Sequence, residues 1–288
     1  MLSEALGDDS EKTFVVKLLK SVSRVYTNIM SQIISIANQK GGVGKTTTAI
    51  NLSAALAKQH QKVLLVDFDS QGNAGRGLGI DVTLVTKTVF DALTGLQDIN
   101  SCIVSTSEDG LFVIPSNLKL ASLDTYLQAN PSNEPFRLLQ KALSKLTGNY
   151  DYIIIDCPPS LGLLSLNALV ASMGVIIPVQ CEYFAMEALA AILSTITRVQ
   201  NDYNPNLRIE GFLLTMYDPR TSLGTEIATQ VRGLFKENTF LTAIPRNISL
   251  PESCAKGLPV GSWRPTSQGA VAYAALAREV LDHDQQKQ

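Results

Sequence analysis

A glycine-rich stretch near the start of the chain carries the clearest chemistry in the sequence. It directly follows an apolar run at 33–37. Glycines let the backbone turn its N–H groups inward around phosphate oxygens, where larger side chains would block the approach. Lys45 would then reach the terminal phosphates, and the Thr46 hydroxyl would be placed to hold Mg²⁺. We interpret the stretch as a phosphate-binding loop made by Lys40, Gly41, Gly42, Val43, Gly44, Lys45, Thr46 and Thr47.

The loop departs from the usual P-loop pattern at one position. The pattern G-x-x-x-x-G-K-[ST] ends on Gly44, Lys45 and Thr46, but its first glycine is replaced by Lys40. The plain alternative is a chance glycine-rich turn with two surface lysines. The preceding strand pattern and the following helix pattern argue against that alternative, because they are the context that confirms a P-loop.

A lysine at the head of a phosphate loop marks the deviant P-loop ATPases, and the string KGGVGKTTT resembles the ParA/Soj chromosome and plasmid partitioning family. The resemblance implies ATP and Mg²⁺ as ligands. It also implies that Lys40 reaches across a dimer interface to the partner's nucleotide, where its charge would neutralise the charge that builds on the transferring phosphoryl group. Lys40 is therefore a candidate catalytic residue.

Two further motifs place carboxylates after apolar runs. Asp67 and Asp69 follow the run at 63–66, and Asp156 follows the run at 152–155. An apolar strand that ends in Asp beside a P-loop is the Walker B arrangement, in which Asp156 holds Mg²⁺ directly or through water. The resemblance implies that Asp69 positions the attacking water and the metal shell. The alternative for Asp67 and Asp69 is a helix or turn cap, and Ser70 stands where the family usually has proline.

Two segments later in the chain resemble the family stretches that frame the nucleotide base. Met216 and Pro245 would pack on adenine, although simple loop packing is the alternative for each of them. Cys157, between Asp156 and two prolines, is expected to fill space in the core because no base lies near it in the sequence.

These motifs need a scaffold that brings strand ends together. Short apolar runs alternate with helical patterns from 31 to 281, which predicts an α/β fold with a mostly parallel twisted sheet and helices on both faces. The resemblance makes this a three-layer P-loop NTPase fold. We expect strands at 33–37, 63–66, 112–115, 152–155, 175–179, 207–216 and 240–244, and helices at 47–58, 118–127, 136–146, 185–199, 223–235 and 267–281.

The domain prediction separates the first 30 residues from the rest. Residues 31–288 are expected to form a single ParA-type ATPase domain. Residues 1–30 read as an extension with a basic amphipathic helix from 14 to 29, which could pack on the domain, remain partly ordered, or touch a membrane, a partner or DNA. Translation could also start at Met30, because the residues after it resemble the usual start of shorter family members.

Composition limits the remaining choices. The chain has 288 residues, 45% of them hydrophobic and 17% charged, with a formal net charge of −2. The four cysteines are far apart, which argues against a disulfide framework or a zinc site. No apolar run approaches the length of a membrane span, so we expect no stable membrane insertion. A net charge this small means that any DNA contact depends on a local patch.

The resemblance also implies partners and a location. Family members form an ATP-bound homodimer, bind DNA without sequence preference, and respond to a ParB/Spo0J-like partner protein that stimulates slow ATP hydrolysis. The chain would then be cytoplasmic and associated with the nucleoid. Because each phosphate contact releases counterions, DNA binding should weaken steeply with salt. For each candidate a solvated surface charge is the alternative, and the candidates are Arg220, Arg232, Arg246 and Arg264.

Two other classes share the same motifs. A MinD-like membrane-cycling ATPase would need an amphipathic C-terminal helix, whereas residues 281–288 are polar and mixed in charge. An iron–sulfur carrier or reductase-type P-loop protein would need paired cysteines, and the sequence has no C-x-x-C. We therefore rank both behind a partitioning ATPase.

Overall fold

The computed structural model describes residues 31–182 and 185–286. The predicted helix between 14 and 29 and the alternative start at Met30 lie outside these residues. Residues 32–288 group together as one compact unit.

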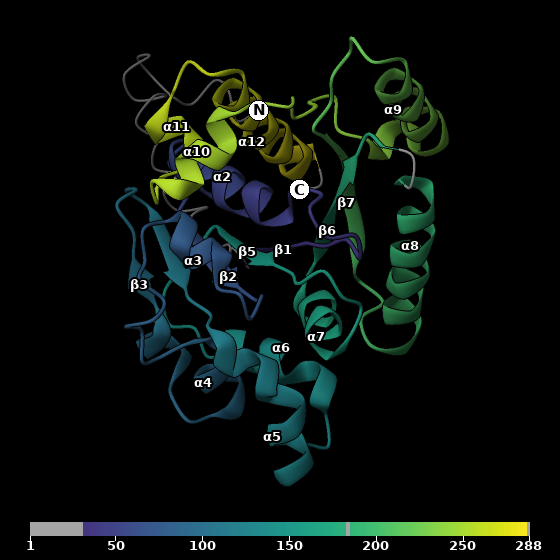
Figure 1. The fold of residues 1–288 in the computed structure, drawn as a ribbon. Coiled ribbons are helices and arrows are strands. Elements are labelled where there is room, and N and C mark those ends of the chain that lie inside the picture. Colours follow the sequence, from purple (N-terminus) through teal and green to yellow (C-terminus); the bar gives the residue numbers. More distant parts are fainter. Residues whose placement is uncertain (1–30, 183–184, 287–288) are drawn as a thin grey trace, which may run out of the picture. The chain divides into compact units, whose positions relative to one another are not determined.

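A seven-stranded sheet forms the centre of this unit (Figure 1). Its strand order is β3-β4-β2-β5-β1-β6-β7, and every neighbouring pair is parallel except the antiparallel edge pair β3 and β4. The strands span β1 Gln32–Ile36, β2 Val63–Asp67, β3 Val104–Ser105, β4 Leu111–Ile114, β5 Tyr152–Asp156, β6 Gly174–Gln180 and β7 Arg208–Thr215.

Helices cover both faces of the sheet, which confirms the predicted three-layer α/β fold (Figure 1). The core residues of β2 alternate between two hydrophobic clusters, with Val63 and Leu65 in one and Leu64 and Val66 in the other. A strand covered on both faces is apolar along its buried length, as β2 is from Val63 to Val66. The first cluster is completed by α2 Lys45–Ala57, α3 Asn73–Gly77, α10 Ser249–Ala255, α11 Val260–Trp263 and α12 Gln268–Gln286.

The second cluster lies on the opposite face. Its helices are α4 Val89–Thr94, α5 Leu123–Ala129, α6 Leu138–Leu143, α7 Leu163–Ala171, α8 Ala185–Asp202 and α9 Ser222–Phe235. Four short 3₁₀ helices complete the described part, namely η1 Ile99–Cys102, η2 Leu118–Ser122, η3 Pro135–Arg137 and η4 Lys236–Asn238.

The register of the central strands positions the predicted site. Asp67 at the end of β2 pairs with Asp156 at the end of β5, and Asp156 pairs in turn with Ile36 at the end of β1. Because parallel strands end at the same edge, the loops that follow these three strands leave the sheet side by side. These loops are the predicted phosphate loop, the Asp69 loop and the Asp156 loop.

One predicted strand is wrong. Residues 240–244 do not form a strand, although isolated bridges on either side join this segment to its neighbours. Between the bridges, the N–H groups of Leu241 and Thr242 donate to the Glu279 carboxylate of α12 at 2.5 and 3.1 Å. A side chain therefore takes the hydrogen bonds that a strand ladder would need.

The other predicted strands and helices are confirmed, with ends shifted by a few residues and with the 118–127 and 136–146 segments each divided into a 3₁₀ turn and an α-helix. The edge strand β3 and the helices α3, α4, α7, α10 and α11 were not predicted. Apart from α7, with nine residues, these elements have seven residues or fewer, too short to show a clear hydrophobic period.

Candidate nucleotide site

The glycine loop has the backbone that a phosphate cradle requires. Gly42 and Gly44 adopt φ values of 75° and 88°, a left-handed conformation that is strained for other residues. Gly44 is the residue before α2, and its carbonyl accepts the Thr48 N–H at 2.8 Å. From the other side, the Thr215 hydroxyl of β7 donates to the Val43 carbonyl at 2.9 Å. The loop is thus fixed at the N-terminal end of a 13-residue helix, where anions are favoured.

Lys45 folds back over this loop. Its Nζ donates to the Lys40 carbonyl at 3.0 Å, and only 7% of the residue is exposed. Burial lowers the pKa of Lys45, while the Asp156 carboxylate opposes that shift most strongly. Within the part of the chain that the structure describes, the buried ammonium has one carbonyl as its hydrogen-bond partner, so it is well suited to take further oxygen partners.

Asp156 is fully buried, as is Asp67 beside it in the sheet. Burial raises its pKa well above the ordinary value, and the neighbouring Asp67 adds to the rise. Both Asp156 carboxylate oxygens are buried and lack a hydrogen-bond partner among the described residues. The Thr46 hydroxyl lies close enough to oppose the pKa rise, although no hydrogen bond of good geometry joins the two. Such an orphaned carboxylate is what a divalent cation would satisfy.

Asp67 differs from Asp156 because the backbone satisfies it. Its two oxygens accept the N–H groups of Gly75 at 2.9 Å and Asp69 at 3.3 Å. Burial nevertheless raises the pKa of Asp67 to about 7. Asp67 thus combines the predicted cap-like bonding with a position beside Asp156.

Asp69 lies at the mouth of the loop after β2. It is half-buried, and its Oδ1 accepts the Gln71 N–H at 3.0 Å. The Gly72 N–H donates to the Asp69 carbonyl at 2.9 Å, so the loop closes as a tight turn even though Ser70 replaces the proline usual in the family. The structure therefore brings Asp69, Asp156 and Lys45 to one edge of the sheet, because they lie at or after the ends of neighbouring parallel strands.

A magnesium ion would fit a mixed set of ligands here rather than an acidic cage. The described residues contain no group of three or more His, Cys, Asp or Glu that could hold a metal. Mg²⁺ commonly takes only one or two carboxylates and completes its shell with phosphate oxygens and water. The orphaned Asp156 oxygens and the nearby Thr46 hydroxyl match that requirement.

Lys40 is held at the loop by two contacts besides the bond that its carbonyl accepts from Lys45 Nζ. Its N–H donates to Asn38 Oδ1 at 3.0 Å, and Asn38 is anchored by donating from Nδ2 to the Pro178 carbonyl at 2.7 Å. Its ammonium lies 3.6 Å from Glu182 Oε2 in an ion pair, with 27% of the side chain exposed. Asn38 and Glu182 were not predicted, because their role depends on the pairing of β1 with β6 and carries no local motif.

The predicted base-framing residues line one cavity. Met216 and Pro245 share a hollow of about 360 Å³ with Gly44 and Thr47 of the phosphate loop. The backbone of Met216 adopts φ 51°, which is uncommon for a residue other than glycine and turns the chain sharply at the wall of the hollow. The cavity thus adjoins the phosphate loop on the side where a base would have to lie.

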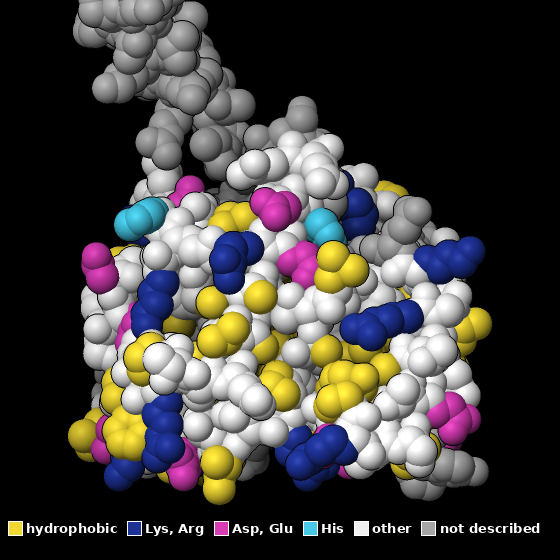
Figure 2. All heavy atoms as spheres, turned by 90° about the horizontal axis from the view of Figure 1, so that it is seen from above, with side chains coloured by type: hydrophobic (Ala, Val, Ile, Leu, Met, Phe, Trp, Pro, Cys, Tyr) yellow, Lys and Arg dark blue, Asp and Glu magenta, His cyan; other side chains and the backbone are white. Residues whose placement is uncertain are grey.

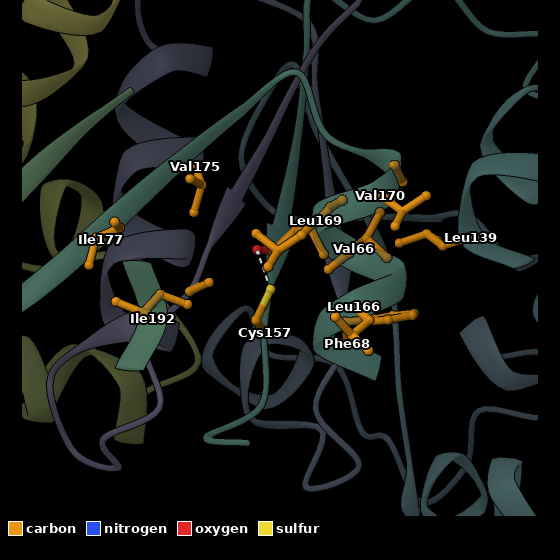
Figure 3. Packing of buried hydrophobic residues seen from close by; sticks show 14 of the residues in the cluster. Val66, Phe68, Leu139, Cys157, Leu166, Leu169, Val170, Val175, Ile177 and Ile192 are labelled. Atoms are coloured by element: carbon orange, nitrogen blue, oxygen red, sulfur yellow. Dashed lines mark hydrogen bonds between the residues drawn. The ribbon is translucent and has the colours of Figure 1, made fainter. Parts of the chain in front are cut away.

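Cys157 packs in the core, as predicted. Its Sγ points to the Ile155 carbonyl at 3.9 Å among apolar side chains that include Leu169 and Val175 (Figure 3). Burial raises the pKa of the Cys157 thiol to about 12, so it stays protonated at neutral pH. Cys102 and Cys181 are buried as well, and all four cysteines are free.

The predicted DNA arginines lie on the surface. The exposed fraction of the side chain is 87% for Arg220, 66% for Arg246 and 54% for Arg264, and Arg232 is exposed as well. In the view from above, the basic side chains lie in separate groups, with hydrophobic, acidic and other side chains between them (Figure 2). The single chain therefore presents scattered basic groups on this face and no continuous basic surface.

No helix within residues 31–182 and 185–286 is long and apolar enough to cross a membrane.

Comparison with known proteins places these features in a family context. The family described as AAA domain matches residues 31–209. The chain is 49% identical to the sporulation initiation inhibitor protein Soj of Bacillus subtilis, over 87% of this chain and 98% of that protein. It is 46% identical to the chromosome partitioning protein ParA of Myxococcus xanthus, over 90% of each.

A solved structure shows a similar arrangement. The cobyrinic acid a,c-diamide synthase of Mycobacterium smegmatis, crystallised with an ATP analogue and magnesium, superposes with a TM-score of 0.80 and is 36% identical. The match covers 90% of this chain and 97% of that protein.

Proposed function

The chain belongs to the Soj/ParA family of chromosome partitioning ATPases, and from this membership we propose that it dimerises around ATP, binds DNA without sequence preference in that state, and hydrolyses ATP slowly to drive chromosome or plasmid segregation. The proposal rests above all on one observation, the orphaned Asp156 carboxylate beside Lys45 and the glycine loop. Buried groups without partners lower stability unless a ligand satisfies them.

ATP and Mg²⁺ are the ligands of this site. The N–H groups of the loop and the Lys45 ammonium would hold the phosphates, and Met216 and Pro245 would pack on the base. Thr46 and Asp156 would hold Mg²⁺, with Asp69 in the shell around it. When bound, Mg²⁺ would neutralise negative charge on the phosphate oxygens.

Each remaining charged residue of the site has a separate task. The half-buried Asp69 would orient the attacking water, and its carboxylate is already fixed by the Gln71 N–H. Lys40 would leave Glu182 and reach the nucleotide of the second subunit. An ammonium supplied in this way from the partner would stabilise the charge that develops in the transition state. Bound triphosphate and dimer formation would then depend on each other.

The proposal includes partners and a cellular location. A ParB-like protein would stimulate hydrolysis and thereby release the dimer from DNA. The chain would act in the cytoplasm on the nucleoid. The candidate DNA contacts are Arg220, Arg232, Arg246 and Arg264.

Sizing the full chain with no nucleotide, with ADP and with a non-hydrolysable ATP analogue tests the dimer directly. We expect a dimer with the analogue and a monomer in the other two states. A gel shift with duplexes of unrelated sequence should then show binding in the triphosphate state alone. A chain that stays monomeric when saturated with the analogue contradicts the role of Lys40, and equal DNA binding in all states contradicts the switch.

A further inference from the structure

The arginines proposed to contact DNA are not free in the single chain. Three of the four are paired with a carboxylate, and one of these carboxylates, Glu182, also pairs with Lys40 of the phosphate loop. The fourth, Arg232, has a long contact from Nη2 to the Leu241 carbonyl at 3.5 Å. The pairs are Arg220 with Asp218 at 2.7 Å, Arg264 with Glu252 at 3.2 Å and Arg246 with Glu182 at 3.7 Å.

The Asp218 pair has the most complete geometry. Arg220 donates from Nε to Oδ1 at 2.9 Å and from Nη2 to Oδ2 at 2.7 Å, so the guanidinium binds the carboxylate in a bidentate manner. The Arg220 N–H also donates to Oδ1 at 3.0 Å. These bonds lower the pKa of Asp218 to about 2, so the carboxylate is ionised at neutral pH. Arg220 thus carries its own counter-charge.

Asp218 also lies near a second proposed DNA contact, because the loop that carries it adjoins the loop of Arg246. The hydrogen bonds from Arg220 lower the pKa of Asp218 most, and the charge of Arg246 adds to that effect. The two loops that carry them are joined by backbone bonds, from the Tyr217 N–H to the Ile244 carbonyl at 3.0 Å and from the Arg246 N–H to the Tyr217 carbonyl at 3.2 Å. A charge at Asp218 therefore acts on Arg220 directly and on Arg246 at longer range.

We propose that Asp218 competes with DNA phosphate for Arg220 and so sets the DNA affinity of this surface. A phosphate that binds an arginine with two bonds uses the same paired N–H groups that Asp218 occupies. To bind Arg220, a DNA phosphate must displace the Asp218 carboxylate. Otherwise it must accept hydrogen bonds from the Arg220 N–H groups that Asp218 leaves free, while Asp218 still neutralises the charge of Arg220. Either route reduces the gain from each phosphate that binds, which keeps the complex weak enough to reverse. The inference rests on the proposed DNA-binding function.

The variant Asp218→Asn removes the charge and keeps Oδ1 as acceptor for the Arg220 N–H, so the loop should stay folded. We expect ATP-bound D218N to bind duplex DNA about 3- to 10-fold more tightly than the parent chain at about 0.1 M salt, because Arg220 can neutralise a phosphate fully. The slope of log affinity against log salt should steepen by about 0.9 for each additional phosphate that the variant neutralises.

Two further variants distinguish the effect of breaking the Arg220–Asp218 pair from the effect of removing any one negative charge. Glu226→Gln removes an exposed carboxylate from α9 that lines the same surface hollow as Arg220 and accepts a bond from Gln230 at 3.3 Å rather than from an arginine. We expect E226Q to change DNA affinity less than D218N. In an Arg220→Ala background, D218N should add no more tightening than E226Q does, because the pair is already broken.

The outcomes distinguish the two proposals. If the parent chain binds DNA with ATP and D218N binds with the same affinity and salt slope, or more weakly, Asp218 does not compete with DNA. Equal tightening by D218N with and without Arg220 contradicts the pair in the same way. If neither the parent chain nor D218N binds any duplex with ATP, the DNA-binding function fails and the role of Asp218 fails with it.

Discussion

The nucleotide site and the arginine surface both depend on charge, but they hold their charges in opposite ways. In the site, Lys45 and Asp156 are buried and their hydrogen-bonding groups are only partly used by the described residues, so each can bind a ligand. On the surface, Arg220 and Arg264 are largely exposed and already paired with acids. Charge removed from water is costly to leave unpaired, whereas exposed pairs are screened and contribute little. Single residues should therefore dominate the site, and small contributions should add up on the surface.

Lys45→Ala should give the largest effect. The variant removes the buried ammonium that would face the phosphates, and loss of one partner from a buried charge pair costs about 2 to 5 kcal/mol, or about 30- to several-thousand-fold in affinity. We expect nucleotide binding to be abolished in calorimetry, together with turnover and the ATP-dependent dimer.

The matched control is Lys58→Ala at the other end of α2. Lys58 contacts Ser262 at 2.8 Å and Glu108 at 3.9 Å near the surface, away from the phosphate loop. K58A should bind ATP like the parent chain. If K45A retained micromolar ATP binding with a normal circular dichroism spectrum, buried charge would not dominate the site.

Asp69→Ala should separate binding from chemistry. Asp69 is half-buried at the loop mouth, so its removal leaves the phosphate cradle intact. We expect ATP binding and dimer formation to persist while turnover falls by at least about 100-fold, the usual contribution of a positioned acid or base. Phosphate release under single-turnover conditions measures this. Normal hydrolysis by D69A would remove Asp69 from the role of orienting water.

The difference between the two regions also explains what the sequence could predict. The site follows from local strings, because a strand, a glycine loop and a terminal Asp each show in the order of residues. The fold class was predictable for the same reason, since the buried strands are continuous apolar runs. The register that brings Asp67 opposite Asp156 was not predicted, because it depends on how distant strands pair.

Other contacts join distant parts of the chain and leave no local pattern. Glu182 meets both Lys40 and Arg246, which lie more than sixty residues away from it on either side. The segment at 240–244 looked like a strand because it is apolar, but Glu279 of α12 takes its N–H groups. The pairing of Arg220 with Asp218 was missed although the two are only two residues apart, because sequence does not show whether a surface carboxylate turns toward its neighbour.

The buried acids predict an unusual pH dependence for the ligand-free chain. The pKa of Asp67 is about 7 in the folded protein against an ordinary value of 3.8, so between these values unfolding releases a proton. Stability from this group is therefore complete below about pH 4 and is lost as the pH rises through 7, at up to about 1.4 kcal/mol for each pH unit. Chemical denaturation without nucleotide between pH 5 and 7.5 measures this trend.

Asp67→Asn should make that trend shallower, whatever its effect on stability at a single pH. The surface control Asp81→Asn removes an acid whose pKa is lowered by Thr83, so it should not flatten the trend. If stability fell equally with pH in D67N and the parent chain, Asp67 would be ionised in the folded protein. The buried acids of the site would then behave more like the exposed, paired charges of the arginine surface.

The smallest effect is expected for a single arginine of the surface. Arg246 has 66% of its side chain exposed, and its pair with Glu182 spans 3.7 Å. Arg246→Ala should weaken DNA binding by the ATP-bound chain about 2- to 5-fold and lower the salt slope by about 0.9 for each phosphate that is no longer neutralised. Fluorescence anisotropy at several salt concentrations measures both quantities.

Arg198→Ala is the control, because Arg198 is equally exposed at 64% and pairs with Asp202 along α8. Equal losses of affinity for R198A and R246A would mean that net charge alone governs DNA binding, whereas a loss above about 100-fold for R246A would make this surface depend on single residues as the nucleotide site does.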